Sequence, residues 1–453
     1  MTSNSDQQLR HAAVNRYHLV GIGGVGMSAL AEALLDTGAV VSGSERFLDQ
    51  GHPLPVLDIL RRQGARIHPQ DGSGVASDLA AVVASSAIEA DNPDLAAAAA
   101  CGVPVVHRSQ ALAAALADRT LVAIAGTCGK STITGMLGHI LDVAGLDPAV
   151  VNGAPCVNWR SESRTGAVRR GSGSFCVVEV DESDRSLLNF RPAHALVSNC
   201  SADHFPLEES HALFDAFLAQ VSGASLDGRH DAEPVPDIQE LDWACTFTFR
   251  GSVVTLPLPG RHNAVNAWQA ARMAEILGVP AEASARALAS FRGISRRMEL
   301  VGTRPDGVRV IDEYAHNPEK IRAALRTLQS RSARTLAIWR PHGYGPLKKM
   351  FDALVAMFAE TLRPDDILFL LPVFDAGGTA ARTIQSDTLR DALLEAGATC
   401  ELVPDHPSLI ERIDATAAPG DIIVTMGARD PDLPLTARAL ASPPEPQSQA
   451  ASR

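Results

Sequence analysis

The stretch AIAGTCGKSTIT (residues 123–134) decides the fold of the middle of this chain. An apolar run reaches two glycines, and a lysine and a run of helix-forming residues follow. A glycine loop between a strand and a helix surrounds an anion with backbone amides. The general nucleotide-binding pattern has four residues between its glycines, whereas this stretch has two. Its context still predicts a phosphate loop, with the candidate binding residues Gly126, Thr127, Gly129, Lys130, Ser131 and Thr132.

Acidic and imidazole side chains follow the next two apolar strands of the same region. Glu179 ends the first strand, in VVEVDESD (177–184), and His204 follows the second, in SNCSADHF (198–205). Solvated turns are the ordinary interpretation of such acids. Mg²⁺ on phosphates, however, takes a few protein ligands and completes its shell with water. We therefore predict Ser131, Glu179 and His204 as metal ligands.

A second glycine loop lies near the N-terminus, in GIGGVGMS (21–28). Glycines after a strand let helix N-terminal amides approach a diphosphate, whatever that diphosphate carries. Glu45 ends the next strand, where an acid would meet a ribose hydroxyl. A dinucleotide dehydrogenase is one interpretation, but no hydride-transfer residues accompany the loop. A nucleotide sugar fits equally well, with Gly21, Gly23, Gly24 and Gly26 at its diphosphate.

The stretch GRHNAVNAW (260–268) begins an amphipathic helix and carries two amides. Asn263 is placed either to cap that helix or to recognise a base edge, and the pattern alone does not separate the two. Asn266 shares the second interpretation.

Strand and helix patterns alternate along the chain, which predicts parallel sheets covered by helices. At about 150 residues per domain, we expect an α/β protein of three domains: a Rossmann-like nucleotide-sugar domain, a central P-loop ATPase-like domain and a C-terminal Rossmann-like α/β domain. The predicted limits are residues 1–16 (disordered tail), 17–118, 119–298, 299–440 and 441–453 (disordered tail).

Composition bounds the class of protein. Hydrophobic residues make up 46% of the chain and charged residues 20%, which supplies ample core. The net charge of -12 argues against nucleic acid as a partner. Seven cysteines without a C-x-x-C pair suggest neither a disulfide framework nor a zinc site. We find no signal peptide or membrane span, so we expect a cytoplasmic protein, and the oligomeric state stays open.

These motifs, in this order, resemble those of the Mur ligase family of ATP-dependent amide-forming enzymes. The likeness rests on the two glycine loops and on SSAIEADNP, VPVVHRSQAL, EVDESD, ADH, GRHNAVNA, GISRRME, DEYAHNP and PHGYG. It implies an ATP- and Mg²⁺-dependent ligase that phosphorylates a carboxylate and lets an amine attack the acyl phosphate. By resemblance the substrates are UDP-N-acetylmuramate and L-alanine, for peptidoglycan precursor synthesis.

The resemblance also assigns residues by motif position. Lys130, Glu179, His204, His316 and His342 would serve catalysis. The nucleotide sugar would further contact Glu45, Ser85, Ser86 and Arg108. ATP would further contact Asn263, Asn266, Arg296, Arg297 and Asp312. The amine substrate would meet Tyr314, His316 and His342.

Three departures from the family pattern leave other functions open. Cys128 and Ser131 stand where the family loop has His and Thr, and Asn317 replaces a second His. After His342, the expected arginines are missing, with Gly343 and Pro346 among the residues there. Arginine suits a two-point grip on a carboxylate, so Arg340, Lys348 or Lys349 would have to substitute. The alternatives are a paralogue with a different carboxylate or amine, and a non-catalytic nucleotide-binding paralogue.

Overall fold

The computed structural model describes residues 15–201, 205–230, 233–375 and 381–442. They form two compact units that divide between Gly293 and Ile294, called unit 1 and unit 2 below. Unit 1 contains two α/β modules and a small antiparallel sheet, and unit 2 contains a third α/β module. The expected three-part α/β organisation is therefore present. In the described ranges, no helix combines the length and apolar character needed to cross a bilayer.

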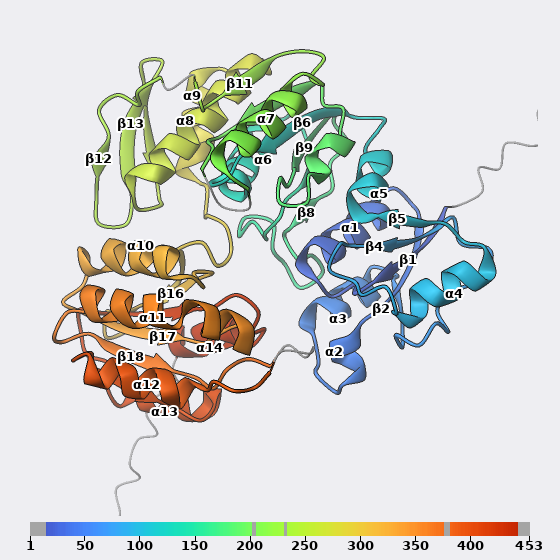
Figure 1. The fold of residues 1–453 in the computed structure, drawn as a ribbon. Coiled ribbons are helices and arrows are strands. Elements are labelled where there is room, and N and C mark those ends of the chain that lie inside the picture. Colours follow the sequence, from blue (N-terminus) through green and yellow to red (C-terminus); the bar gives the residue numbers. More distant parts are fainter. Residues whose placement is uncertain (1–14, 202–204, 231–232, 376–380, 443–453) are drawn as a thin grey trace, which may run out of the picture. The chain divides into compact units, whose positions relative to one another are not determined.

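The first module is a five-stranded parallel sheet in the order β3-β2-β1-β4-β5. Its strands, blue to cyan in Figure 1, are β1 (Arg16–Val20), β2 (Val40–Ser44), β3 (Arg66–His68), β4 (Ala81–Ala84) and β5 (Val105–His107). Its helices are α1 (Val25–Asp36), α2 (Arg46–Asp49), α3 (Pro55–Arg62), α4 (Pro93–Cys101) and α5 (Arg108–Ala115). The strand order reverses at β1, and ligands bind at the carboxyl ends of strands beside such a reversal.

The second module is a six-stranded sheet in the order β11-β10-β6-β9-β7-β8. Its strands are β6 (Thr120–Ala125), β7 (Ala149–Val151), β8 (Val168–Arg169), β9 (Phe175–Glu179), β10 (His194–Val197) and β11 (Ser225–Asp227). Its helical segments are α6 (Lys130–Val143), the 3₁₀ helix η1 (Ser186–Asn189) and α7 (Leu207–Leu218). Only β8 runs antiparallel to its neighbour among these described strands. The polar composition of residues 161–174 predicts a loop, but two of them pair with β7.

A three-stranded antiparallel sheet and two helices complete unit 1. These elements are β12 (Gln239–Glu240), β13 (Cys245–Phe249), β14 (Ser252–Leu256), α8 (Arg261–Ile276) and α9 (Ala281–Ala289). Trp268 of α8 packs edge-on against Phe249 of β13, with ring centroids 5.1 Å apart. This contact fixes the small sheet to α8.

The two α/β modules of unit 1 share a hydrophobic core. Ala29 and Ala33 of α1 belong to the same buried cluster as Leu121 and Val178 of the second sheet. Small side chains let the helix approach the neighbouring module closely. Two ion-pair contacts of 2.9 and 2.7 Å also join Arg164 to Asp36 at the end of α1. The two glycine loops therefore belong to one packed body.

Unit 2 is a six-stranded sheet in the order β15-β16-β20-β17-β18-β19, orange to red in Figure 1. Its strands are β15 (Glu299–Thr303), β16 (Arg309–Glu313), β17 (Arg334–Trp339), β18 (Ile367–Leu370), β19 (Cys400–Leu402) and β20 (Asp421–Met426). Its helices are α10 (Pro318–Gln329), α11 (Tyr344–Thr361), α12 (Ser386–Glu395), α13 (His406–Asp414) and α14 (Leu433–Ala441). The edge strand β15 is antiparallel, whereas the other pairings are parallel. The last strand, β20, inserts between β16 and β17, so segments distant in sequence end side by side.

Candidate functional site

The loop 126–129 joins β6 directly to α6, which begins at Lys130. Gly126 and Gly129 have φ angles of +123° and +86°, a region that favours glycine. A Cβ on Gly126 would collide with Ser198, and one on Gly129 would lie 2.5 Å from Asn266 Oδ1. The two glycines thus allow Ser198 and Asn266 to approach the loop closely, and the loop precedes the N-terminus of α6, the kind of position that suits an anion.

The segment after β10 holds this loop in place. Asn199 accepts a hydrogen bond from the Cys128 amide at 2.9 Å, and Ser198 Oγ donates to the Cys128 carbonyl at 2.6 Å. The Ser201 amide donates to Thr127 Oγ1 at 3.0 Å. No local pattern marks Asn199 as a loop contact, because the pairing of β10 with β6 joins segments far apart in sequence. His204, predicted as a metal ligand, lies outside the described residues.

Lys130 points back over the loop. Its Nζ donates to the Gly126 carbonyl at 2.7 Å and to Glu182 at 2.8 and 3.1 Å. The Glu182 side chain is only 5% exposed. Lys130 thus lies over the loop with a carboxylate as its partner, and its contact with a phosphate oxygen stays a prediction.

Ser131 and Glu179 lie around one short segment, residues 152–153. The Gly153 amide donates to Glu179 Oε2 at 2.8 Å, and a Cβ on Gly153 would lie 2.6 Å from both Glu179 oxygens. The side-chain amide of Asn152 donates through Nδ2 to the backbone carbonyl of Ser131 at 3.1 Å. Glu179 Oε1 has no hydrogen-bond partner among the described residues. A hydroxyl and a carboxylate are hard oxygen donors, so this pair fits Mg²⁺.

The two amides of α8 differ in their surroundings. Asn266 lies against the phosphate loop at Gly129. Asn263 is buried and donates to the Pro259 carbonyl at 2.7 Å. The N-cap of α8 is Gly260, so Asn263 does not cap the helix by accepting a hydrogen bond from its amides. Thr132 follows in the first turn of α6 and is half-buried.

The first glycine loop is closed by Glu45. Glu45 accepts hydrogen bonds from the Gly23 amide at 2.9 Å and the Phe47 amide at 3.2 Å. A Cβ on Gly23 would lie 2.8 Å from the same carboxylate. Glu45 therefore shapes the loop itself, and its predicted contact with a ribose stays a prediction. Ser85 and Ser86 directly follow β4, on the other side of β1.

Arg108 lies between the first glycine loop and two acids that follow β9. Its Nη1 lies 3.1 Å from where a Cβ of Gly26 would stand, and its Nη2 lies 3.7 Å from both Asp181 and Asp184. Burial acts to raise the pKa of Asp181, but hydrogen bonds from Ser183 and the charges of Lys130 and Arg108 outweigh it and lower that pKa. One guanidinium thus faces the first glycine loop and the acids that follow β9.

The predicted ATP-contacting residues of unit 2 form one network. Arg296 Nε lies 3.4 Å from Asp312, which also accepts from Thr425 at 2.9 Å. Burial raises the pKa of Asp312. Arg296 and Arg297 both stack on the Tyr314 ring, at 5.1 and 5.3 Å from its centroid. These contacts bring the predicted residues together, and their contact with ATP stays a prediction.

Tyr314, His316 and His342, which we predict to meet the amine substrate, lie side by side. The His316 ring centroid lies 5.5 Å from that of Tyr314 and 5.1 Å from that of His342, both edge-on. Burial, with the positive charges of His316 and Arg429, lowers the pKa of His342 to about 4. His342 is therefore neutral at neutral pH. Sequence patterns did not point to Arg429, which follows a strand distant in the chain.

Arg340 is used elsewhere. It pairs with Asp430 at 2.7 Å, contacts His406 at 3.1 Å and donates to the Pro372 carbonyl at 2.9 Å. His406, Asp430 and Asp432 are residue types that bind metals and lie close together. The Arg340 guanidinium, however, already contacts His406 Nε2 and Asp430 Oδ2. Arg340 is thus a poor substitute for the missing arginines.

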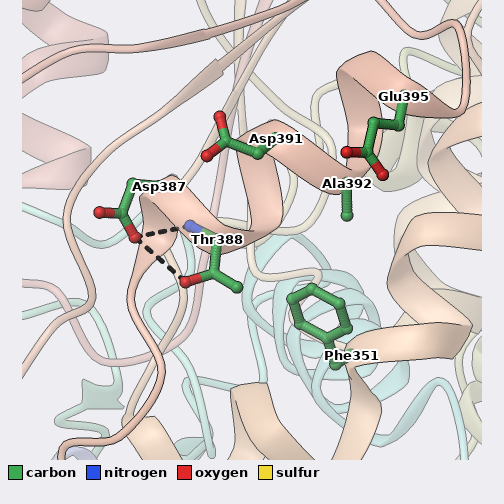
Figure 2. A pocket seen from close by; sticks show the side chains of 6 residues that line it. All are labelled: Phe351, Asp387, Thr388, Asp391, Ala392 and Glu395. Atoms are coloured by element: carbon green, nitrogen blue, oxygen red, sulfur yellow. Dashed lines mark hydrogen bonds between the residues drawn. The ribbon is translucent and has the colours of Figure 1, made fainter.

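A pocket of about 410 Å³ lies on unit 2, and none of the predicted site residues lines it. Figure 2 shows its lining, which comes from α11 and α12: Phe351, Asp387, Thr388, Asp391, Ala392 and Glu395. Three carboxylates face this pocket, and they disfavour anionic substrates. We therefore do not place the phosphate or carboxylate chemistry there.

Comparison with known proteins identifies the family. The model "Mur ligase family, catalytic domain" matches residues 16–120, and "Mur ligase, glutamate ligase domain" matches residues 296–429. The UDP-N-acetylmuramate–L-alanine ligase of Paenarthrobacter aurescens (strain TC1) is 36% identical, with 92% of this chain and 95% of that protein covered. The enzyme of the same name from Arthrobacter sp. (strain FB24) is 37% identical, with coverages of 90% and 91%.

Solved structures share the fold. The crystal structure of UDP-N-acetylmuramate-alanine ligase MurC from Thermotoga maritima has a TM-score of 0.77 at 23% identity, covering 94% of this chain and 98% of that one. Together with the phosphate loop and its carboxylates, these likenesses define the class as an ATP-dependent, ADP-forming ligase. Within that class, the chain belongs to the Mur ligase family.

Proposed function

We propose that this protein joins L-alanine to the carboxylate of UDP-N-acetylmuramate, in the cytoplasm, as a step of peptidoglycan precursor synthesis. The observation that carries the proposal is the presence of two glycine loops in unit 1, at Gly21–Gly26 and Gly126–Gly129. Each follows a parallel strand and begins a helix. Two such loops suit two phosphate-bearing substrates, namely a nucleotide sugar and ATP. The names of the relatives supply the sugar and the amino acid.

The reaction transfers the γ-phosphoryl group of ATP to a carboxylate oxygen and releases ADP. The amine then attacks the acyl carbon, loses a proton, and expels phosphate as the amide bond forms. Such chemistry depends on positioning and on charge neutralisation, and a protein nucleophile is unnecessary. In our proposal Lys130 binds the transferred phosphoryl group, Asn266 borders the ATP loop, and Arg108 binds the sugar diphosphate.

Mg²⁺ fits the donor set of Ser131 and Glu179, with His204 proposed as a further ligand. When bound, Mg²⁺ neutralises phosphate charge. Glu179 is oriented for this role by the Gly153 amide. The remaining ATP contacts that we propose are Arg296, Arg297 and Asp312. Tyr314, His316 and His342 are proposed to surround the amine.

One observation favours a second candidate, a ligase for a different amine or carboxylate. Gly343 and Pro346 stand where arginines were expected, so the amino acid is recognised by other groups. Incubating the enzyme with ATP, Mg²⁺, UDP-N-acetylmuramate and a panel of amino acids, with mass spectrometry of the products, separates the candidates. We expect the alanyl product and equal amounts of ADP. If the enzyme forms a product only with another amino acid, or forms no product with any of them, the first proposal is contradicted.

A further inference from the structure

Three strands of unit 2 end side by side and bring three loops together. In the pairing register, Glu313 of β16 and Trp339 of β17 both lie opposite Met426 of β20. Tyr314 and His316 follow β16, His342 follows β17, and residues 427–430 follow β20. The carboxyl ends of parallel strands are where α/β sheets bind ligands. The loop after β20 therefore belongs to the edge that carries the ring cluster.

This loop is anchored on both sides of Arg429. Arg296 donates to the carbonyl groups of Gly427 and Ala428, the latter at 3.4 Å. On the other side, Asp430 is buried and pairs with Arg340 at 2.7 Å. Arg429 itself is exposed and has no hydrogen bond or ion pair within the described part of the chain. A fixed backbone thus presents one uncommitted guanidinium.

The guanidinium of Arg429 lies close enough to His342 for its charge to disfavour protonation of that ring. The other cations near this edge are committed or differently placed. Arg296 binds the loop backbone and Arg340 pairs with Asp430. Arg297 stacks on Tyr314. Lys348 and Lys349 lie one turn into α11 and carry point charges, whereas a guanidinium grips a carboxylate with two parallel hydrogen bonds.

We propose that Arg429 binds the α-carboxylate of the incoming amino acid, beside the rings of Tyr314, His316 and His342. The residue takes over the task of the arginines that are missing at positions 343 and 346. The inference rests on the proposed function, because it requires an amino acid as the amine substrate. It deepens that function by naming the group that selects an α-amino acid over a simple amine.

The test uses the full-length enzyme and steady-state kinetics with whichever amino acid the wild-type enzyme accepts. Arg429→Ala should raise the KM for the amino acid roughly 10- to 150-fold, the range for a lost hydrogen bond to a charged group. The KM values for ATP and the nucleotide sugar should change less than about twofold, the level of a lost weak contact. Arg429→Lys should restore part of the affinity. Arg438 is an exposed arginine of α14, so Arg438→Ala is the matched control. Its KM for the amino acid should equal that of the wild type.

The amino acid amide provides a second readout. The wild-type enzyme should discriminate strongly against the amide, which lacks the carboxylate, and Arg429→Ala should lose that discrimination. An unchanged KM for the amino acid in a folded Arg429→Ala enzyme overturns the assignment while the proposed function stands. A raised KM for ATP instead assigns Arg429 to phosphate and also overturns it. Failure of the wild-type enzyme to use any amino acid overturns the function and this inference together.

Discussion

Lys130 shows how a phosphate-binding side chain is kept in position before ATP arrives. Its ammonium group spans the Gly126 carbonyl and the Glu182 carboxylate. Both partners hold the side chain over the loop, so the cost of ordering it is met in the folded protein. In our proposal ATP replaces the carboxylate as the partner of Lys130. The pair is mostly buried, which makes its partner valuable to the fold as well.

We predict that Lys130→Ala lowers kcat about 100- to 1,000-fold, as expected when one donor to developing charge is removed. The measurement is ADP release with all three substrates present. Lys320→Ala, at an exposed position of α10, is the matched control and should leave kcat unchanged. The double variant Lys130→Ala/Glu182→Gln removes the buried unpaired charge, so it should recover stability but not activity. Undiminished turnover in Lys130→Ala would show that the site assignment is wrong.

His342 makes stability depend on pH. Its pKa is about 4 in the folded protein, against about 6.5 for a free imidazole. Between these values the unfolded chain binds more protons, so the folded state loses stability as pH falls from 6.5 to 4. We predict a loss of about 1 to 3 kcal/mol over that window. In urea unfolding between pH 7 and 4, His342→Gln should show a shallower pH dependence than the wild type. Parallel curves would contradict the prediction.

The sequence predicts those site residues that local patterns mark. Lys130 and Ser131 follow a glycine loop, and Glu179 ends an apolar strand, so their neighbourhood could be expected before the fold was known. Asn199 and Arg429 could not, because each reaches its loop through strand neighbours far apart in sequence. Glu182 was visible in the acidic cluster, but its pairing with Lys130 depends on side-chain geometry.

At the scale of elements, two helix glycines have opposite roles. Gly138 of α6 packs so closely that a Cβ would lie 2.7 Å from Val150 Cγ2 and 2.9 Å from the Trp159 ring. Gly345, in the first turn of α11, is exposed, and a Cβ there meets nothing within 4 Å. Close packing against β7 therefore accounts for the first glycine, and no contact accounts for the second.

We predict opposite signs for the two alanine substitutions. Gly138→Ala should destabilise the protein by about 1 to 3 kcal/mol, because overpacking outweighs the gain in helix propensity. Gly345→Ala should stabilise it by up to about 1 kcal/mol. Chemical denaturation of both variants beside the wild type measures the difference. Equal effects would mean that the packing of α6 against β7 does not constrain this position.

The elements themselves were largely predictable, whereas their order in the sheets was not. Apolar runs such as those of β6 and β17 are long and bounded by polar residues, which marks them as strands. Nothing local reveals that β20 inserts between β16 and β17, or that β15 runs antiparallel. The short pairing of β8 with β7 was missed, because a two-residue strand leaves no periodic pattern.

At the scale of the whole molecule, the residues that we propose for substrate binding come from both units. Both glycine loops lie in unit 1, whose modules share the core around Ala29 and Ala33. The ring cluster and Arg429 lie in unit 2. In a bond-forming step the amine nitrogen must come within about 3 to 3.5 Å of the acyl carbon. The proposed reaction therefore requires substrates held by both units to meet.

We predict that this requirement is visible in hydrogen exchange measured by mass spectrometry. A non-hydrolysable ATP analogue with Mg²⁺ should slow amide exchange at residues 126–132, and UDP-N-acetylmuramate at residues 21–26. L-alanine alone should change little, because a single carboxylate contact in unit 2 does not offset the entropy cost of fixing the free amino acid. With both other ligands present, L-alanine should slow exchange at residues 427–430, since ordering by one ligand lowers the entropy cost of the next.

The pattern of protection shows whether unit 2 binds the amino acid alone or only when the other two ligands are bound. Slower exchange at residues 427–430 with L-alanine alone would show that unit 2 forms the complete amino-acid site. Unchanged exchange there with all three ligands would place the amino acid elsewhere, whatever the behaviour of the glycine loops. Arg429→Ala supplies the control, because it removes the proposed carboxylate contact without touching unit 1. It should abolish the L-alanine effect at 427–430 while the protection of residues 21–26 and 126–132 persists.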